Sequence, residues 1–261
     1  MALATVVAVS AVVGLTVGNV YHDADAVVAL LRGYDLVALV VAVPLLVAAL
    51  LVRTARGLLV WAGVLVYAIY NYAYYLFGTQ LNALFGLHAA VIALAVVGLV
   101  VLLAGTDVRA IAAGYSRRTP VRWVGGVLFA LGVSLAAMWS FGVVRALAAG
   151  SALDEPSRLI VPASFTHLGA ALDLAVLVPG YLTAGVLVWR RVAWGYVAAV
   201  ALLVAGVLHQ VAYMTALVFQ AAAGIPGATA FDSAEPVIAG VFAVAATLLL
   251  ASCGRRPGTP M

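Results

Sequence analysis

The polar residues that could carry chemistry lie inside long apolar runs of the sequence. In residues 57–77, Tyr67, Tyr70, Asn71 and Tyr74 are spaced at i, i+3, i+4 and i+7, so they share one face of a helix. Phenol and amide groups on a shared face can hydrogen-bond a ligand or a neighbouring helix. The alternative interpretation is an aromatic belt at a membrane interface. A belt suits Tyr74 better than the deeper Tyr67 and Asn71.

The deepest acid of the sequence lies in a second run, residues 164–189. Asp173 is about 14 Å from the start of this run, at a helical rise of about 1.5 Å per residue. An ionisable group at the bilayer centre costs about 2.5–3.5 kcal/mol on insertion scales, so we expect Asp173 to face the bundle interior. His167 lies six residues earlier and points in a different direction. We expect Asp173 to have a polar partner among Tyr70, Asn71, Tyr74, His88 and His209.

Three further apolar runs carry polar groups at comparable depth. His209, Gln210 and Tyr213 lie together in one run, His88 lies in another, and Asp35 begins a third. The candidate ligand-binding residues are therefore Asp35, Tyr70, Asn71, Tyr74, His88, His167, Asp173, His209, Gln210 and Tyr213.

Three of the histidines together with Asp173 also raise the hypothesis of a metal or haem site, because imidazole and carboxylate groups bind zinc and iron. The spacing does not favour it, since no two histidines are four residues apart and each stands alone on its run. A hydrogen-bonding role is the commoner one for such a histidine. The only cysteine, Cys253, excludes an intramolecular disulfide and a cysteine cluster. The sequence assigns no metal and no cofactor.

The composition predicts an all-α integral membrane protein. Hydrophobic residues make up 67% of the 261 residues and charged residues 8%, whereas soluble domains carry about 25% charged residues. The mean hydropathy is +1.21. The net charge of +4 comes from arginines scattered in short loops, which is not the pattern of a nucleic-acid-binding surface. The lipid bilayer is the partner that this composition indicates.

Charges, prolines and glycines divide the apolar runs into segments of membrane-spanning length. They predict an eight-helix transmembrane bundle forming a single domain over residues 1–261. The predicted spans are 2–19, 35–52, 57–77, 82–104, 122–148, 164–189, 194–222 and 236–253.

The arginines predict the orientation, because basic residues resist translocation. If both termini are cytoplasmic, ten arginines lie on the cytoplasmic side and Arg32 and Arg158 lie in outer loops, with Arg145 near the outer end of its helix. This predicts a multi-pass protein of the cell membrane. The acids, with Asp35 among them, then gather mainly outside. The ten cytoplasmic arginines are Arg53, Arg56, Arg109, Arg117, Arg118, Arg122, Arg190, Arg191, Arg255 and Arg256.

An internal repeat is also predicted. Shifting the sequence by 138 residues aligns Asp35 with Asp173 and Tyr75 with Tyr213, and further Arg and Gly pairs fall at the same offset. Four helices would separate the copies, so both would insert in the same orientation. This predicts a 4+4 parallel repeat with halves at about 1–105 and 122–253.

The pattern Leu172-Asp173-Leu174, Pro179, Arg190-Arg191 and Trp194-Gly195-Tyr196 resembles that of a family of uncharacterised prokaryotic polytopic membrane proteins. The resemblance covers roughly residues 20–105 and 165–200. It implies a multi-pass topology and carries no known activity. At the position of His88 the family pattern has an aromatic residue more often, which argues against an obligatory metal role there.

Three functions follow as hypotheses. The first is binding or transport of a small molecule or ion in a polar pocket in the outer half of the bundle. The second is an intramembrane enzyme that uses a metal or haem at His88, His167, His209 and Asp173. The third is a structural or sensor subunit whose polar groups fix helix packing. The sequence specifies neither the ligand nor the oligomeric state.

Overall fold

The computed structural model describes residues 1–52 and 54–254, and the regular elements of these residues are all helices. Within them, seven helical segments are long and apolar enough to cross a membrane. Six of them agree with predicted spans to within three residues, and the seventh, Asp25–Leu51, begins ten residues before the predicted span 35–52. Arg53, Arg255 and Arg256, which the predicted orientation used, lie outside the described residues. The seven segments are Asp25–Leu51 (α2, η1 and α3), Ala55–Gly78 (α4 and η2), Phe85–Ala104 (α5), Val121–Ala149 (α7), Ala163–Trp189 (α8, η3 and α9), Ala193–Ala222 (α10) and Ala234–Ser252 (α11).

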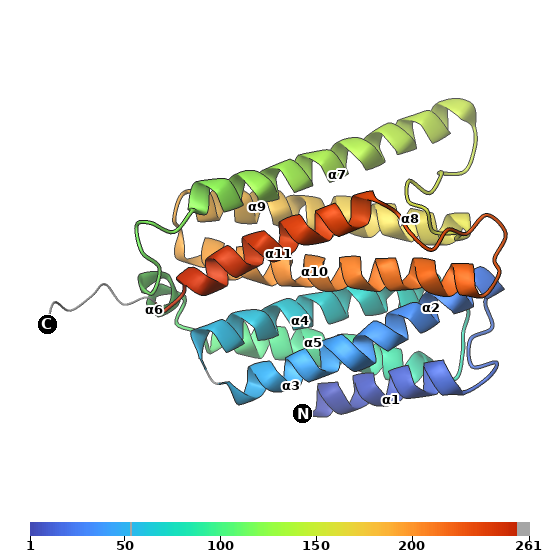
Figure 1. Cartoon of the computed structure of the whole chain (residues 1–261), viewed down its shortest axis with the longest axis horizontal. Coiled ribbons are helices and arrows are strands. Elements are labelled where there is room, and N and C mark those ends of the chain that lie inside the picture. Colours follow the sequence, from blue (N-terminus) through green and yellow to red (C-terminus); the bar gives the residue numbers. More distant parts are fainter. Residues whose placement is uncertain (53, 255–261) are drawn as a thin grey trace, which may run out of the picture.

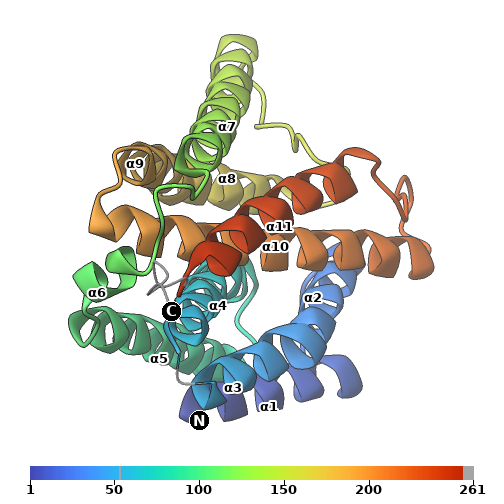
Figure 2. The ribbon, with the colours of Figure 1, turned by 60° about the vertical axis from the view of Figure 1, so that its left-hand side comes forward.

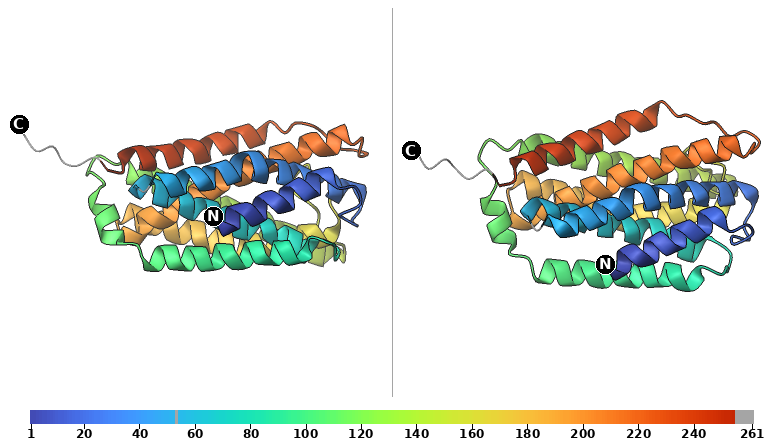
Figure 3. Two further views of the ribbon diagram at one scale, coloured as in Figure 1. Left: turned by 90° about the horizontal axis from the view of Figure 1, so that it is seen from below. Right: turned by 60° about the horizontal axis from the view of Figure 1, so that its bottom comes forward.

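The first helix of the structure is shorter than the predicted span 2–19. Helix α1 covers Ala2–Thr16, which is 15 residues. Such a helix is about 22 Å long, whereas a hydrocarbon core is about 30 Å thick. Its N-terminus lies part way along the bundle, while the neighbouring helices extend further (Figures 1 and 3). A short helix α6, Val108–Ala113, connects α5 to α7.

Helix α10 is the centre of the bundle (Figure 2). It packs against α2, α4, α9 and α11, while α5 packs on α4 and α7 packs mainly on α9. Helix α7 leaves the bundle towards its C-terminal end and is among the least buried of the long helices. The central position of α10 means that polar residues on its different faces meet different neighbours.

The two ends of the bundle differ in charge. Helix α6 and the loops beside it carry Arg109, Arg117, Arg118, Arg190 and Arg191, and we call this the basic end. The opposite loops, residues 17–24, 79–84, 150–162 and 223–233, form what we call the acidic end. These loops hold Asp23, Asp154, Glu155 and Asp232, together with Arg158.

Arginines at the basic end serve as caps. Arg56 donates to the carbonyls of Ala251 and Cys253, at the end of α11. Arg191 donates to the carbonyls of Ser116, Arg117 and Thr119 in the loop after α6. The last carbonyls of a helix have no partner within it, so guanidinium groups at this position stabilise the helix end.

Three π-helical turns interrupt the long helices beside the buried polar groups. They are η1 (Ala38–Ala42), η2 (Tyr74–Gly78) and η3 (Asp173–Leu177). η1 and η3 each end two residues before a proline, Pro44 or Pro179, whose missing N–H weakens the local helical ladder. The preceding residue makes the wide-turn bond instead, with Val43 N–H donating to Ala38 and Val178 N–H to Asp173. The extra residue of such a turn changes the face on which later side chains lie.

One predicted boundary was wrong, and it concerns Asp35. The second span begins at Asp25 in α2 (Asp25–Val37) rather than at Asp35. Asp35 is therefore ten residues inside a helix and fully buried, not an acid of an outer loop. The apolar stretch after Asp25 extends the helix, and Asp35 is accommodated because its carboxyl group receives hydrogen bonds from two tyrosines.

Close helix packing at α10 depends on Gly33 of α2. A Cβ at Gly33 would lie 2.8 Å from the Cα of Ala216 on α10. Backbone atoms cannot move away as a side chain can, so any larger residue would separate the two helices. This contact brings α2, and with it the Asp35 cluster, against the centre of the bundle.

We predict that Gly33→Ala lowers the thermal unfolding midpoint of the detergent-solubilised protein. Overpacking typically costs about 1–3 kcal/mol. Gly126→Ala is the matched control, since it also lies within a helix and its Cβ would meet no atom within 4 Å. The control gains only the better helix propensity of alanine, about 1 kcal/mol. Equal midpoints for the two variants would contradict the packing argument.

Candidate ligand-binding site

A cavity of about 370 Å³ lies between α2, α4, α7, η3, α10 and α11 and extends to loop 150–162 at the acidic end. Its volume falls within the range of small-molecule pockets, about 300–1,000 Å³. Of the predicted site residues, six line it: Tyr70, Tyr74, Asp173, His209, Gln210 and Tyr213.

Asp173 is the polar centre of the cavity wall. The Tyr70 hydroxyl donates to its Oδ1 at 2.6 Å, and the indole N–H of Trp139 on α7 donates to its Oδ2 at 2.7 Å. Asp173 is 8% exposed and begins η3. Tyr70 is one of its expected partners, whereas Trp139 was not expected. Two donors fix the carboxyl group and leave further lone pairs for a ligand.

Aromatic groups surround this carboxyl group. The hydroxyls of Tyr70 and Tyr74 are 3.2 Å apart, so a chain of hydrogen bonds can run from Tyr74 through Tyr70 to Asp173. His209 meets Tyr70 edge to face, with 5.0 Å between ring centroids. The His209 Nδ1 is buried and has no partner among the described residues. The wall thus presents a carboxylate, phenols and an imidazole to the same space.

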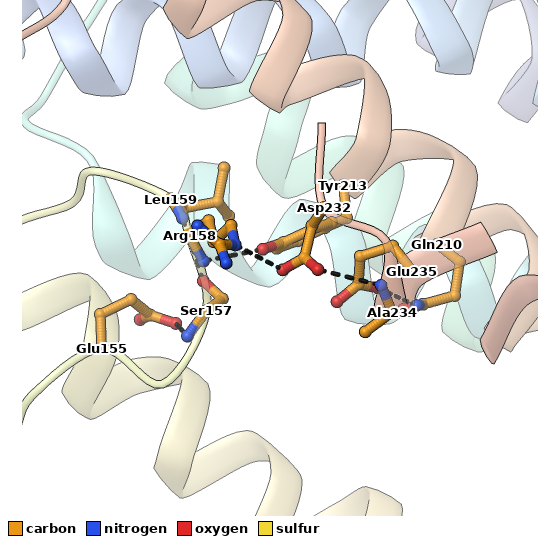
Figure 4. Close-up of polar contacts among 9 residues, drawn as sticks. All are labelled: Glu155, Ser157, Arg158, Leu159, Gln210, Tyr213, Asp232, Ala234 and Glu235. Carbon is orange, nitrogen blue, oxygen red and sulfur yellow. Dashed lines mark hydrogen bonds and ion pairs between the residues drawn. The ribbon is translucent and has the colours of Figure 1, made fainter. Parts of the chain in front are cut away.

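The rim at the acidic end is fastened by polar contacts (Figure 4). Arg158 pairs with Asp232 at 3.3 Å, and its backbone N–H donates to the Tyr213 hydroxyl at 2.9 Å. The side-chain amide of Gln210 donates to Glu235. These contacts join loop 150–162, α10 and the start of α11.

Two further residues hold this loop in place. Glu155 accepts from the Ser157 N–H at 3.1 Å and from the Thr166 hydroxyl at 3.0 Å. Gln220 on α10 is fully buried, exchanges two hydrogen bonds with the backbone of Ile160, and donates to the carbonyl of Ala26 on α2. Gln220 was not among the predicted site residues, although an amide near the end of an apolar helix is a visible signal in the sequence.

Four predicted site residues do not line the cavity. His167 is exposed on α8, Ala163–Leu172. Asp35, Asn71 and His88 are each fully buried away from the cavity. Asn71 shares a helical turn with Tyr70 and Tyr74, but α4 is enclosed on several sides and its neighbouring residues meet different helices.

Asp35 and His88 belong to a second polar cluster between α1, α2, α4 and α5. The hydroxyls of Tyr21 and Tyr75 donate to the two oxygens of Asp35 at 2.8 and 3.0 Å. The His88 ring lies 4.8 Å from that of Tyr75. Burial and then the Asp35 carboxyl group raise the pKa of the Tyr21 phenol, so Tyr21 stays protonated and remains a donor. The Asp35 carboxyl group fits against α1 because residue 14 is a glycine. A Cβ at Gly14 would lie 2.1 Å from the Asp35 Oδ2.

The metal hypothesis gains no support from the geometry. Among residues 1–52 and 54–254, no three His, Cys, Asp or Glu side chains are placed to hold one metal ion. His88 lies in the second cluster and His167 is exposed, so only His209 and Asp173 share the cavity.

Comparison with models of protein families, with curated proteins and with solved structures found no match to this chain. The resemblance to a family of prokaryotic membrane proteins therefore stays a prediction. The fold and the hydropathy together define the class. The chain forms an all-helical apolar bundle of the kind that is embedded in membranes.

We predict that Asp173→Leu lowers the unfolding midpoint in detergent more than Asp173→Asn does. Leucine leaves the Trp139 N–H and the Tyr70 hydroxyl without their acceptor, and an unsatisfied buried group costs about 1–3 kcal/mol. Asparagine keeps one carbonyl oxygen and nearly the same shape. If the leucine variant were as stable as the unmodified protein, these two hydrogen bonds would not contribute to the fold.

Proposed function

We propose that this protein binds a small molecule in the cavity between α4, α7, η3, α10 and α11, entering from the acidic end. The observation that supports this most is the cavity itself, about 370 Å³ with a fixed carboxyl group in its wall. A polar group whose only role is packing is normally enclosed, as Asp35 is. Asp173 instead borders space that the protein leaves open.

The rim supports the same proposal. Pro156 and Ser157 of loop 150–162 line the cavity, and Pro156 is exposed, so the cavity extends to the end of the bundle. The loop is fixed to α10 by Gln220 and Tyr213, which gives the entrance a defined shape. A preformed site loses less entropy on binding than one that must first order.

We propose further that the acidic end faces outward and that α1 is an eighth, shorter membrane segment. The arginines of loops 105–120 and 190–192 support this orientation, since basic residues are retained on the cytoplasmic side. α1 carries no charged residue and packs on α2, α3 (Val43–Leu51) and α5 within the bundle. Both termini would then be cytoplasmic, in the cell membrane.

A 4+4 repeat remains part of this proposal. In favour of it, each half has a buried aspartate at or shortly before a π-helical turn that ends two residues before a proline. The registers differ, because Asp173 is the first residue of η3 whereas Asp35 lies three residues before η1. Against it, Asp35 is bonded to Tyr75, whereas Asp173 is bonded to Tyr70 and Trp139 rather than to Tyr213. The copies would have diverged in their polar contacts while keeping the helix geometry.

The orientation predicts which loops an impermeant thiol reagent reaches in intact cells. In a Cys253→Ser background, Ser151→Cys at the acidic end should be labelled from outside. Ser116→Cys, in the loop after α6, should be labelled only after the cells are permeabilised. External labelling of the second variant would overturn the orientation.

The binding proposal predicts that water-soluble reagents reach deep into the cavity. Ala205 on α10 lines it and is 8% exposed, whereas Ala199 on the same helix is fully buried elsewhere. In purified protein with Cys253→Ser, a methanethiosulfonate reagent should modify Ala205→Cys at least about tenfold faster than Ala199→Cys, as expected for a thiol that water reaches. Equally slow modification at both positions would mean that the cavity is closed to water and would refute the proposed function.

A further inference from the structure

The lining of the cavity carries acids but no basic side chain other than His209. Asp173, Glu155 and Glu235 line it, and none of the residues around it is an arginine. The sequence contains no lysine. Near the acidic end, Arg158 pairs with Asp232 and Arg145 with Asp154, and Arg32 of α2, three residues before Asp35, lies outside the lining. A ligand entering from this end therefore meets uncompensated negative charge.

The Asp173 carboxyl group acts only as a hydrogen-bond acceptor in the structure. It accepts one bond from the Tyr70 hydroxyl and one from the Trp139 indole N–H. Neither donor carries a charge, so no protein cation balances an ionised Asp173. A cation in the cavity would supply the missing charge and could bind the lone pairs that remain.

Aromatic rings complete the surroundings of such a cation. Trp139, Tyr70 and Tyr74 flank Asp173, and Tyr181 and Phe242 lie deeper, with 6.0 Å between their ring centroids. A cation within about 6 Å of an aromatic centroid is attracted by the negative face of the ring. Rings of this kind also accept the apolar part of an organic molecule.

The size and the donors favour an organic cation over a metal ion. The cavity of about 370 Å³ is much larger than an inorganic ion needs, and among the described residues no three of its acids and histidine are close enough to hold one metal ion. We propose that the ligand of this cavity is a monovalent organic cation, an ammonium group on an apolar body. The ammonium group binds at Asp173 and the apolar body lies against the aromatic wall. This inference rests on the proposed function.

The first experiment measures charge selectivity at the thiol of Ala205→Cys, in the Cys253→Ser background. Two methanethiosulfonates of similar size are compared, one bearing a trimethylammonium group and one bearing a sulfonate. The ratio of their rates is divided by the same ratio for a small free thiol. This removes the intrinsic difference in reactivity between the two reagents, while the ratio at one thiol already cancels the effect of the cavity on that thiol. Negatively charged clefts raise the local cation concentration, so we expect a normalised ratio of about 10 or more.

Two variants test whether the acids of the lining cause the selectivity. Asp173→Asn and Glu235→Gln should each lower the ratio several-fold, and either suffices if the other fails to fold. Asp154→Asn is the matched control, because Asp154 is an exposed acid at the same end that pairs with Arg145 and lies outside the lining. The control should leave the ratio unchanged.

The second experiment compares two isosteric ligands, benzyltrimethylammonium and neutral neopentylbenzene. Each is tested for protection of Ala205→Cys against the trimethylammonium reagent. We expect the cation to protect at a concentration at least about tenfold lower than the neutral compound, a difference of about 1.4 kcal/mol. Asp173→Asn should remove most of this difference.

The outcomes separate the two proposals. If neither reagent modifies the thiol of Ala205→Cys, the proposed function fails. If both react with the ratio of a free thiol, or if the neutral compound protects as well as the cation, the cavity binds small molecules but the cationic class is wrong. A faster reaction with the sulfonate would also overturn the inference.

Discussion

Two buried carboxyl groups are held by tyrosines of one helical segment, and most of the bundle is arranged around these bonds. Tyr70 of α4 donates to Asp173, and Tyr75 in the η2 turn that continues it donates to Asp35. In a hydrocarbon environment an unpaired carboxyl group is costly, so each acid must lie where a donor reaches it. Asp173 in η3 and Asp35 in α2 therefore both lie beside the segment formed by α4 and η2. Helix α10 packs against α2, α4 and α9.

The two acids share this chemistry but differ in their surroundings. Asp35 lies under α1, where Gly14 leaves only enough room for its carboxyl group. Asp173 lies beside α7, a helix that packs mainly on α9 and diverges from the bundle. Trp139 of α7 reaches back to Asp173 and ties the diverging helix to the cavity wall. The tyrosine–aspartate bond at Asp35 is therefore fully enclosed, whereas the one at Asp173 borders the cavity.

Hydrogen bonds fasten the loops of the acidic end to the helices. Gln220 joins Ile160 of the long loop to Ala26 at the start of α2, and Arg158 joins the same loop to Asp232. At the basic end, Arg56 and Arg191 satisfy carbonyls of helix ends and turns. At the basic end arginines thus serve backbone carbonyls, whereas at the acidic end Glu155 and Glu235 line the cavity. This difference is the structural basis for expecting a cationic ligand from the acidic side.

The sequence by itself determined the membrane class, the bounds of six of the seven long helices and the place of Asp173 along its helix, because these follow from local composition and a fixed rise per residue. It also included Tyr70 among five candidate partners of Asp173. Only the tertiary structure decided that Trp139 is the second donor, that His88 and Asn71 lie away from the cavity, and that Asp35 is inside a helix. Helical periodicity states which residues share a face, but which helix lies opposite that face depends on packing between distant segments. The π-helical turns add to this, since each one rotates the residues that follow it away from the face that a regular helix predicts.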